Sequence, residues 1–422
     1  MTSSQHEKDL MSCVHCGLCL PACPTYLETG SEADSPRGRL VLMRKMHEGT
    51  LSPQDAGVTR HLDLCLGCRA CETACPSGVP YGRILETARE QINASNVRPK
   101  LAALSRWGLL ETLTHPKLMT AALKAARIMT NGDVPSEAVR LLSGDPAAAG
   151  QSVSLPQTLS PPLPPTITPA VGVKRARVGV LTGCAMRVLF GDVNNDTVRV
   201  LAANGCEVLV NRRQGCCGAL HAHNGSIAQA QAMARGLIDA FSPFDGLDAI
   251  IVNSAGCGSL MKEYGQLLAD DESYAMKAEA FAAKVRDVSE WLDELGWVAP
   301  LKKPSGAPTA MTYHDACHLA HGQQVREAPR SLLSLLPNAV WAEMTESEVC
   351  CGSAGIYNLT EPEMARRLRE RKLENILATG ATVVATGNPG CLAWIASGLK
   401  ERGLPGIRVA HPVTLLAEAL DS

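Results

Sequence analysis

The sequence predicts a multidomain protein in which a helix-rich, cysteine-dense module is followed by two repeated α/β units. The first observation behind this fold class is length, because 422 residues at about 150 residues per domain correspond to roughly three domains. The second is that two runs of four cysteines lie within the first 80 residues. The third is that one pattern of cysteines and glycines occurs twice after a proline-rich stretch.

Composition excludes several classes of protein. Hydrophobic residues make up 45% of the chain and charged residues 19%, which is enough apolar surface to fill cores and argues against disorder. The 40 basic and 42 acidic side chains leave no basic field for nucleic acid. The polar N-terminus lacks the apolar core of a secretory signal, so we expect a cytoplasmic protein. In a reducing compartment, closely spaced cysteines are metal ligands more often than disulfides.

Two uncharged runs, at 146–173 and 375–399, are long enough to suggest membrane spans. The first contains seven prolines, and the second is interrupted by Gly-Asn-Pro-Gly at 387–390. We therefore predict no transmembrane segment, which leaves peripheral contact or partner subunits as the routes to a membrane.

The first predicted unit, residues 1–100, is an iron–sulfur module. Each cysteine run has the form C-x-x-C-x-x-C-x-x-x-C-P, the spacing of bacterial two-cluster ferredoxins. The two-residue gaps let three successive sulfurs surround one 4Fe-4S cluster, whereas the longer gap and the proline direct the fourth sulfur elsewhere. We therefore assign cluster 1 to Cys13, Cys16, Cys19 and Cys75, and cluster 2 to Cys23, Cys65, Cys68 and Cys71.

Zinc and inert structural thiols are the alternatives for these runs. Zinc sites use two C-x-x-C hooks per metal and gain nothing from a fourth cysteine followed by proline. The long separation of the runs and a helical pattern at 37–48 indicate the helix-rich variety of ferredoxin module. Four arginines near the ligands in sequence would raise cluster potentials if buried, although solvated side chains are the simpler expectation: Arg37, Arg39, Arg69 and Arg83.

Two connecting segments follow. Residues 101–143 carry apolar side chains at helical spacing and form a predicted helical extension. Residues 144–174 are rich in proline, serine and threonine and form a predicted linker in extended, polyproline-like conformation.

The predicted cysteine-rich repeats occupy 175–300 and 301–422. The single cysteine precedes the Cys-Cys-Gly by 32 residues in one copy and 33 in the other, and 40 residues separate the pair from the last cysteine in both. A short apolar run before each last cysteine predicts a strand, a turn and a helix, so the cysteines would lie at the carboxyl ends of parallel strands. The repeated cysteines are Cys184, Cys216, Cys217 and Cys257, then Cys317, Cys350, Cys351 and Cys391.

Adjacent cysteines can face one metal site when the glycine after them permits a sharp turn, as Gly218 and Gly352 would. Four thiols per copy suffice for a 4Fe-4S cluster, so we predict at least one further cluster, in either copy; inert thiols are the alternative. The flanking histidines would serve as ligands or proton carriers, or, as we favour, belong to a polar loop over the sheet edge: His221, His223, His314, His318 and His321.

The sequence contains no recognisable motif for an organic cofactor. The sequence contains neither the Gly-x-Gly-x-x-Gly dinucleotide fingerprint nor a Gly-Lys dipeptide of a P-loop, so we expect neither flavin nor NAD on this chain. An iron–sulfur cluster moves single electrons and accepts no hydride, so a partner with a two-electron carrier is required.

These motifs, with Ser35-Pro36-Arg37-Gly38-Arg39 and Cys350-Cys351-Gly352-Ser353-Ala354-Gly355, resemble those of the iron-sulfur subunits of bacterial glycolate oxidases. The resemblance implies an electron-transfer subunit, without catalytic residues of its own, in a complex with flavin-containing subunits that oxidise glycolate to glyoxylate. It further implies a respiratory quinone or other acceptor at the inner face of the cytoplasmic membrane.

Each repeat also resembles the cysteine-rich domain of heterodisulfide reductases, but Leu260 and Trp394 stand where that pattern has a further cysteine. A heterodisulfide-reductase-like enzyme with thiol chemistry at the repeats therefore remains an alternative, as do the equivalent subunits of glycerol-3-phosphate and D-lactate dehydrogenases. A non-redox scaffold with structural clusters is the third. The substrate, the terminal acceptor and the stoichiometry of the complex are not encoded in recognisable motifs of this chain.

Overall fold

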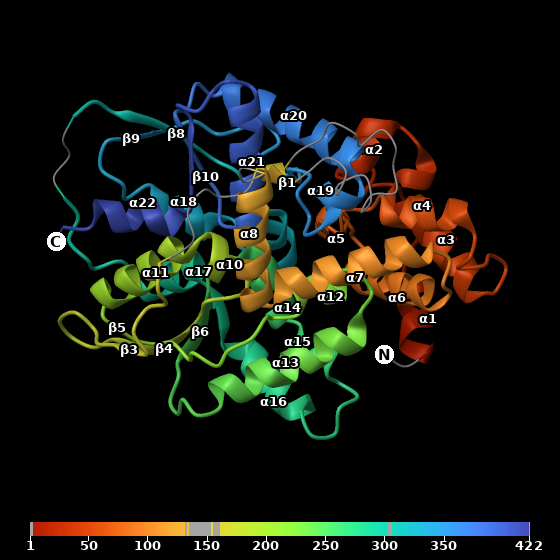
Figure 1. Ribbon diagram of the computed structural model, residues 1–422, viewed down its shortest axis with the longest axis horizontal. Coiled ribbons are helices and arrows are strands. Elements are labelled where there is room, and N and C mark those ends of the chain that lie inside the picture. The colour runs from red at the N-terminus through yellow and green to blue at the C-terminus, as the bar shows by residue number, and fades with distance from the viewer. Residues whose placement is uncertain (1–2, 131–132, 135–152, 155–160, 303–305, 422) are drawn as a thin grey trace.

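The computed structural model describes residues 3–130, 133–134, 153–154, 161–302 and 306–421 (Figure 1). The N-terminal module, red to orange in Figure 1, packs against both repeats, which are coloured yellow to green and teal to blue. In the described residues, no helix is both long and apolar enough to cross a membrane.

The N-terminal module is helical, as predicted. Helix α3 begins at Pro36, whose fixed φ suits a first turn, and the Ser35 hydroxyl caps it by accepting a hydrogen bond from the Gly38 amide. Helix α6 buries Ile84, Leu85 and Ile92 against the other helices. The elements are α1 (Ser3–Met11), α2 (Pro24–Thr29), η1 (Glu32–Asp34), α3 (Pro36–His47), α4 (Ala56–Asp63), α5 (Ala70–Thr73) and α6 (Tyr81–Ala94).

Helices α7 (Lys100–Thr114) and α8 (Pro116–Thr130) form a hairpin after this module. The chain breaks between them because His115 precedes a proline and is extended, with φ −109° and ψ 102°. The hairpin contacts the first repeat where Met119 and Leu123 pack on Val188. The predicted helical extension is therefore helical through Thr130, and residues 135–143 lie outside the described part.

The first repeat contains a five-stranded sheet in the order β3-β5-β4-β6-β7. All neighbouring strands are parallel except β3, which pairs antiparallel with β5. Strand β3 falls inside the predicted linker, so the linker assignment is wrong there, because the β-branched Ile167 and Thr168 join the sheet edge. The strands are β3 (Ile167–Thr168), β4 (Ala176–Leu181), β5 (Cys206–Leu209), β6 (Ala249–Val252) and β7 (Val285–Asp287). A separate pair joins β1 (Asp133–Val134) to β2 (Val153–Ser154).

The second repeat has a parallel sheet in the order β11-β10-β8-β9. This matches the order β7-β6-β4-β5 of the first, so the repeated cysteine pattern reflects a repeated topology. Its strands are β8 (Thr309–Tyr313), β9 (Ala339–Trp341), β10 (Val383–Ala385) and β11 (Arg408–Ala410). The predicted strand, turn and helix occur in both copies, as β6 followed by α14 (Ala255–Met261) and as β10 followed by α21 (Pro389–Glu401).

The two repeats share one hydrophobic core. Val178 and Ile251 of the first sheet and Tyr313 of the second belong to the same buried group, and α22 of the second repeat packs on α11 of the first. The remaining helices cover the sheets: α10 (Ala185–Leu189), α11 (Gly191–Ala203), α12 (Ala219–His223), α13 (Ile227–Phe241), α15 (Tyr264–Leu267), α16 (Ala275–Lys284), α17 (Val288–Leu295), η3 (His318–Gly322), α18 (Glu327–Leu333), α19 (Tyr357–Thr360), α20 (Pro362–Ala378) and α22 (Pro412–Ala419).

Candidate metal centres

The first cysteine run surrounds a cavity near the surface. The five cysteines that line it are Cys13, Cys16, Cys19, Cys71 and Cys75. Cys75 thus lies with the first run although it belongs to the second in sequence. This placement is what crossed ligation requires, in which each run supplies the fourth ligand of the other run's cluster. Cys16 is exposed and the apolar side chains of Met11, Val14 and Leu18 around it are 49–68% exposed.

The second group is buried: Cys23, Cys65, Cys68 and Cys71 are each 7–9% exposed. Burial raises the pKa of the Cys71 thiol, and the neighbouring thiols of Cys68, Cys65 and Cys23 raise it further. Cys23 therefore lies with the second run, the counterpart of the placement of Cys75. Gly67, at φ +65°, turns the chain between Cys65 and Cys68, and its amide donates to the Cys65 sulfur at 3.4 Å.

Of the four arginines that lie near the cysteine ligands in sequence, Arg39 contacts the buried second group of cysteines. Its side chain is fully buried, and Nη1 lies 3.9 Å from Cys23 Sγ. Burial of the Cys65 thiol raises its pKa, but the charges of Arg39 and Arg89 outweigh this and leave the pKa below its usual value. The expectation of a solvated side chain is thus wrong for Arg39.

The other three arginines form ion pairs. Arg37 pairs with Glu32 at 2.8 Å, Arg69 with Glu72 at 2.7 Å and Arg83 with Asp9 at 2.7 Å. Their charges are therefore offset by carboxylates close by.

In the first repeat, the four cysteines contact one another in sequence order. The sulfurs of Cys184 and Cys216 are 3.4 Å apart, Cys216 contacts Cys217, and Cys217 contacts Cys257. Gly218, at φ +86°, makes the turn after the pair, and a side chain there would meet the carbonyl of Ala230 at 3.0 Å.

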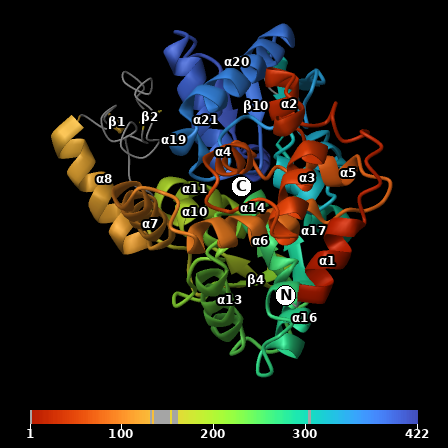
Figure 2. The same ribbon diagram turned by 90° about the vertical axis from the view of Figure 1, so that its right-hand side faces the viewer.

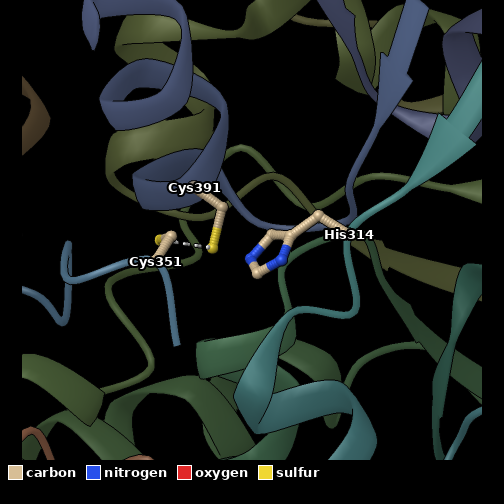
Figure 3. Close-up of side chains that lie close together, drawn as sticks. All are labelled: His314, Cys351 and Cys391. Atoms are coloured by element: carbon tan, nitrogen blue, oxygen red, sulfur yellow. Dashed lines mark hydrogen bonds between the residues drawn. The ribbon is translucent and has the colours of Figure 1, made fainter. Parts of the chain in front are cut away.

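The second repeat reproduces this chain of contacts. The sulfurs are 3.9 Å apart between Cys317 and Cys350 and 3.4 Å apart between Cys351 and Cys391, while Cys350 contacts Cys351. Gly352, at φ +89°, makes the equivalent turn against the carbonyl of Ala365. An imidazole nitrogen of His314 and the sulfurs of Cys351 and Cys391 lie within 4.8 Å of one another (Figure 3).

Both sets fit a metal chemically. Hydrogen bonds from neighbouring thiols lower the pKa of Cys216 and of Cys351, whereas those neighbours have raised pKa values, so the thiols of each set share protons rather than ionise independently. Thiolates are the form that binds a metal, and all-sulfur donor sets suit iron–sulfur clusters. Leu260 and Trp394, at the positions without a further cysteine, are buried, and the guanidinium of Arg369 lies over the Trp394 ring at 4.3 Å.

The flanking histidines do not form the polar loop over the sheet edge that we favoured from the sequence, because four of the five lie in the short helices α12 and η3. His221 and His314 are buried, and His321 is only 5% exposed. Burial lowers the pKa of His318 to about 3, so its ring is neutral, and its Nε2 donates to the Gly67 carbonyl at 3.0 Å. His223 pairs with Glu86 at 2.7 Å. His318 and His223 therefore link the repeats to the N-terminal module, since each contacts a residue of that module.

One cysteine of the second group, Cys68, lies against the cysteine set of the second repeat. Cys68 belongs to the same buried hydrophobic core as Cys350, Cys351 and Cys391. Burial raises the pKa of Cys68, and the proximity of Cys317 raises it further. No sequence signal predicts this contact, because Cys68 and Cys317 are far apart along the chain.

Comparison with known protein families identifies the domains in which these cysteines lie. A 4Fe-4S dicluster domain matches residues 9–79, and a cysteine-rich domain matches 178–262 and again 311–396. The chain is 37% identical to the "Probable glycolate oxidase iron-sulfur subunit" of Bacillus subtilis and 34% identical to the "Glycolate oxidase iron-sulfur subunit" of Escherichia coli. Each alignment covers 98% of this chain and 94% of the relative.

More distant relatives share parts of the architecture. The chain is 27% identical to one subunit of the fumarate reductase (CoM/CoB) of Methanothermobacter marburgensis, over 98% of this chain and 73% of that protein. Among solved structures, a hypothetical protein from Helicobacter pylori superimposes with a TM-score of 0.55 at 9% identity, covering all of this chain and 73% of that one. At that identity the similarity concerns the fold alone.

Proposed function

Since this chain belongs to the family of glycolate oxidase iron-sulfur subunits, we propose that it carries electrons from a flavin-containing subunit, which oxidises glycolate to glyoxylate, toward a respiratory quinone or another acceptor. The observation that carries this proposal is the arrangement of the cysteines, in which two four-cysteine groups lie side by side and the second abuts a further set. Such a series of one-electron sites suits electron transfer and offers no position for hydride chemistry.

The ligands follow from the two crossed groups. Cys13, Cys16, Cys19 and Cys75 would hold cluster 1, and Cys23, Cys65, Cys68 and Cys71 would hold cluster 2. The placement of Cys75 beside the first run and of Cys23 beside the second supports this assignment. A third cluster in the repeats is supported by four mutually contacting thiols in each copy. When bound, these clusters supply reversible one-electron reduction.

The exposure of the two groups indicates a direction. Cys16 is exposed and is bordered by apolar side chains that face solvent, such as Val14 and Leu18, whereas the cysteines of cluster 2 are buried. Exposed apolar surface next to a redox site is typical of a docking surface for a partner protein. We place the flavin subunit at cluster 1, so that electrons continue through cluster 2 to the second repeat.

We expect the isolated protein, purified with its clusters, to stay oxidised when glycolate is added anaerobically. The physical reason is that glycolate oxidation releases a hydride equivalent, for which this chain has no acceptor of its own. Addition of the flavin subunit should then bleach the visible absorbance of the clusters.

Reduction by glycolate without any partner would contradict the proposal and would place the active site in the paired-cysteine repeats. D-lactate tested beside glycolate with the same flavin subunit distinguishes the D-lactate alternative. Relatives named "Lactate utilization protein A" are 27–29% identical to this chain, whereas the glycolate oxidase subunits are 34–37% identical, and this higher identity supports glycolate.

A peripheral membrane location is supported by the outward face of the hairpin, which Figure 2 shows at one edge of the molecule. A solvent-facing helix surface is normally polar, yet Leu101 and Leu104 are 61% exposed and Trp107 is 55% exposed on α7. Residues 97–125 contain five basic side chains and a single carboxylate, Glu111, although the whole chain has a net charge of −2. Apolar side chains with a tryptophan beside lysines are the surface that an amphipathic element presents to anionic lipid.

We expect the full chain to co-float with vesicles containing phosphatidylglycerol and to bind phosphatidylcholine vesicles weakly. The double variant Leu104→Glu with Trp107→Glu should bind at least about tenfold less, because it loses the apolar contact and adds charges that the anionic surface repels. Met276→Glu, which changes an 86% exposed side chain on α16, is the matched control and should bind as the unchanged protein does. Equal flotation of the double variant and the control would refute a lipid-binding hairpin.

A further inference from the structure

The cysteine sets of the two repeats differ in the side chains that surround them. Position 181 in the first repeat corresponds to position 314 in the second, because each lies three residues before the single cysteine, where the corresponding strands β4 and β8 end. The first position holds Leu181, which is buried against Cys184 and Cys216, and the second holds His314. The cysteine set of the first repeat therefore has a hydrocarbon side chain at the position where the set of the second repeat has an imidazole.

The imidazole of His314 is oriented by the protein. Its Nδ1 lies 3.0 Å from the carbonyl oxygen of Ser347 and so carries the proton that it donates, which leaves the lone pair on Nε2. Nε2 is buried and makes no hydrogen bond of ordinary length to another described residue, and the ring lies close enough to Cys351 to lower the pKa of that thiol. Figure 3 shows the ring turned toward the sulfurs of Cys351 and Cys391. A histidine whose other nitrogen donates to a backbone carbonyl is the usual arrangement of a metal ligand.

A buried cation adds a second difference. The turn at Gly218 packs on Ala230 of α13, and the turn at Gly352 packs on Ala365 of α20, so the two helices occupy equivalent places in the two repeats. In this alignment Lys372 of the second repeat corresponds to Leu237 of the first. Lys372 is 1% exposed, and its Nζ donates to the carbonyls of Glu346 and, at 3.3 Å, of Ser347. Leu237 is fully buried beside the cysteines of the first repeat. Buried thiolate ligands need a compensating charge, which the second repeat supplies at this position and the first does not.

The first repeat also contains a buried histidine, His221, and its Nδ1 likewise has no hydrogen-bond partner among the described residues. Only its other nitrogen has polar neighbours. Its Nε2 lies 3.4 Å from the Thr114 hydroxyl and 3.8 Å from the Glu111 carboxylate. The difference is that, among the described residues, a histidine nitrogen and two cysteine sulfurs lie within 4.8 Å of one another in the second repeat, at His314, Cys351 and Cys391, and not in the first.

We propose that the third cluster resides in the second repeat and that His314 Nε2 is one of its ligands. The inference rests on the proposed function only in that it assumes an iron–sulfur centre in the repeats. It assigns this centre to one copy, next to Cys68 of cluster 2, and it gives the centre one nitrogen donor and three thiolates, so that His314 takes the place of one of the four sulfurs of Cys317, Cys350, Cys351 and Cys391.

The test compares the full chain, anaerobically purified and reduced, with ordinary and with ¹⁵N-labelled histidine. Pulsed electron paramagnetic resonance of the unchanged protein should show coupling to a histidine nitrogen. This first measurement requires no variant. The coupling should be absent from His314→Leu and present in His411→Gln. His411 is the matched control because it is equally buried, but both of its nitrogens are occupied, by the Asn253 carbonyl at 3.0 Å and the Val413 amide at 3.1 Å.

A centre in the repeats without histidine coupling, or with coupling that persists in His314→Leu, would overturn the ligand assignment and leave the proposed electron transfer intact. An unchanged protein with iron for two clusters only would instead remove the third cluster and this inference with it. If His314→Leu fails to accumulate, His314→Cys keeps a donor at the site and should retain the iron while losing the nitrogen coupling.

Discussion

Replacing Cys75 by serine is expected to remove the cluster bound by Cys13, Cys16 and Cys19 and to leave the cluster of its own sequence run in place. Cys75 lines the same cavity as the first run, whereas Cys23 adjoins the buried thiols of the second. A cluster that loses one of four thiolate ligands loses a strong anionic bond. In the reduced protein, electron paramagnetic resonance should lose the signal of cluster 1 and its spin coupling to cluster 2, and should keep the signal of cluster 2.

Cys206→Ala is the matched control for this variant. Cys206 lies on β5, is fully buried in the core shared by the repeats, and belongs to none of the cysteine motifs. It should retain both centres, although the smaller side chain lowers the free energy of unfolding by about 1 kcal/mol. Loss of the Cys65, Cys68 and Cys71 centre in Cys75→Ser, with the first centre intact, would show that each run binds its own cluster and that crossed ligation is wrong.

The second large effect concerns the iron content of the repeats. Anaerobically purified protein should contain about twelve iron atoms per chain, from three clusters of four irons each. Cys350→Ser should reduce this to about eight, because Cys350 contacts both Cys317 and Cys351 and its sulfur is buried among them. Cys216→Ser is the corresponding change in the first repeat and should leave the content near twelve.

Both serine variants alter a buried cysteine before a Cys-Gly turn, so they carry similar costs in stability and differ mainly in the site that they affect. A loss of about four irons in Cys216→Ser alone would move the centre to the first repeat. A content near eight in the unchanged protein and in both variants would identify the repeats as a metal-free platform on which the N-terminal module is mounted.

Local spacing explains what was predictable about the N-terminal module. The gaps between cysteines restrict where successive sulfurs can lie, so Cys-x-x-Cys-x-x-Cys and the proline after the fourth cysteine predicted crossed groups before any packing was considered. The same holds for the repeats, where apolar runs before Cys257 and Cys391 predicted a strand, a turn and a helix, and both copies have the strand, with the cysteine in the helix that follows it. The prolines of 144–174 misled the linker assignment at β3, because two β-branched residues suffice to extend an edge.

Burial and long-range proximity, in contrast, were decided by the tertiary structure. Arg39 and Arg37 look alike in sequence, yet Arg39 is enclosed beside Cys23 and Arg37 pairs with Glu32 at the surface. His314 was expected in a loop, but the fold brings it beside Cys351, in the Cys-Cys-Gly turn, and Cys391, at the start of α21. Cys68 meets Cys317 only because the module packs on the second repeat. Spacing along the chain constrains neighbours within a turn or a strand, whereas contacts between distant segments depend on which apolar faces are buried together, and no local pattern encodes that choice.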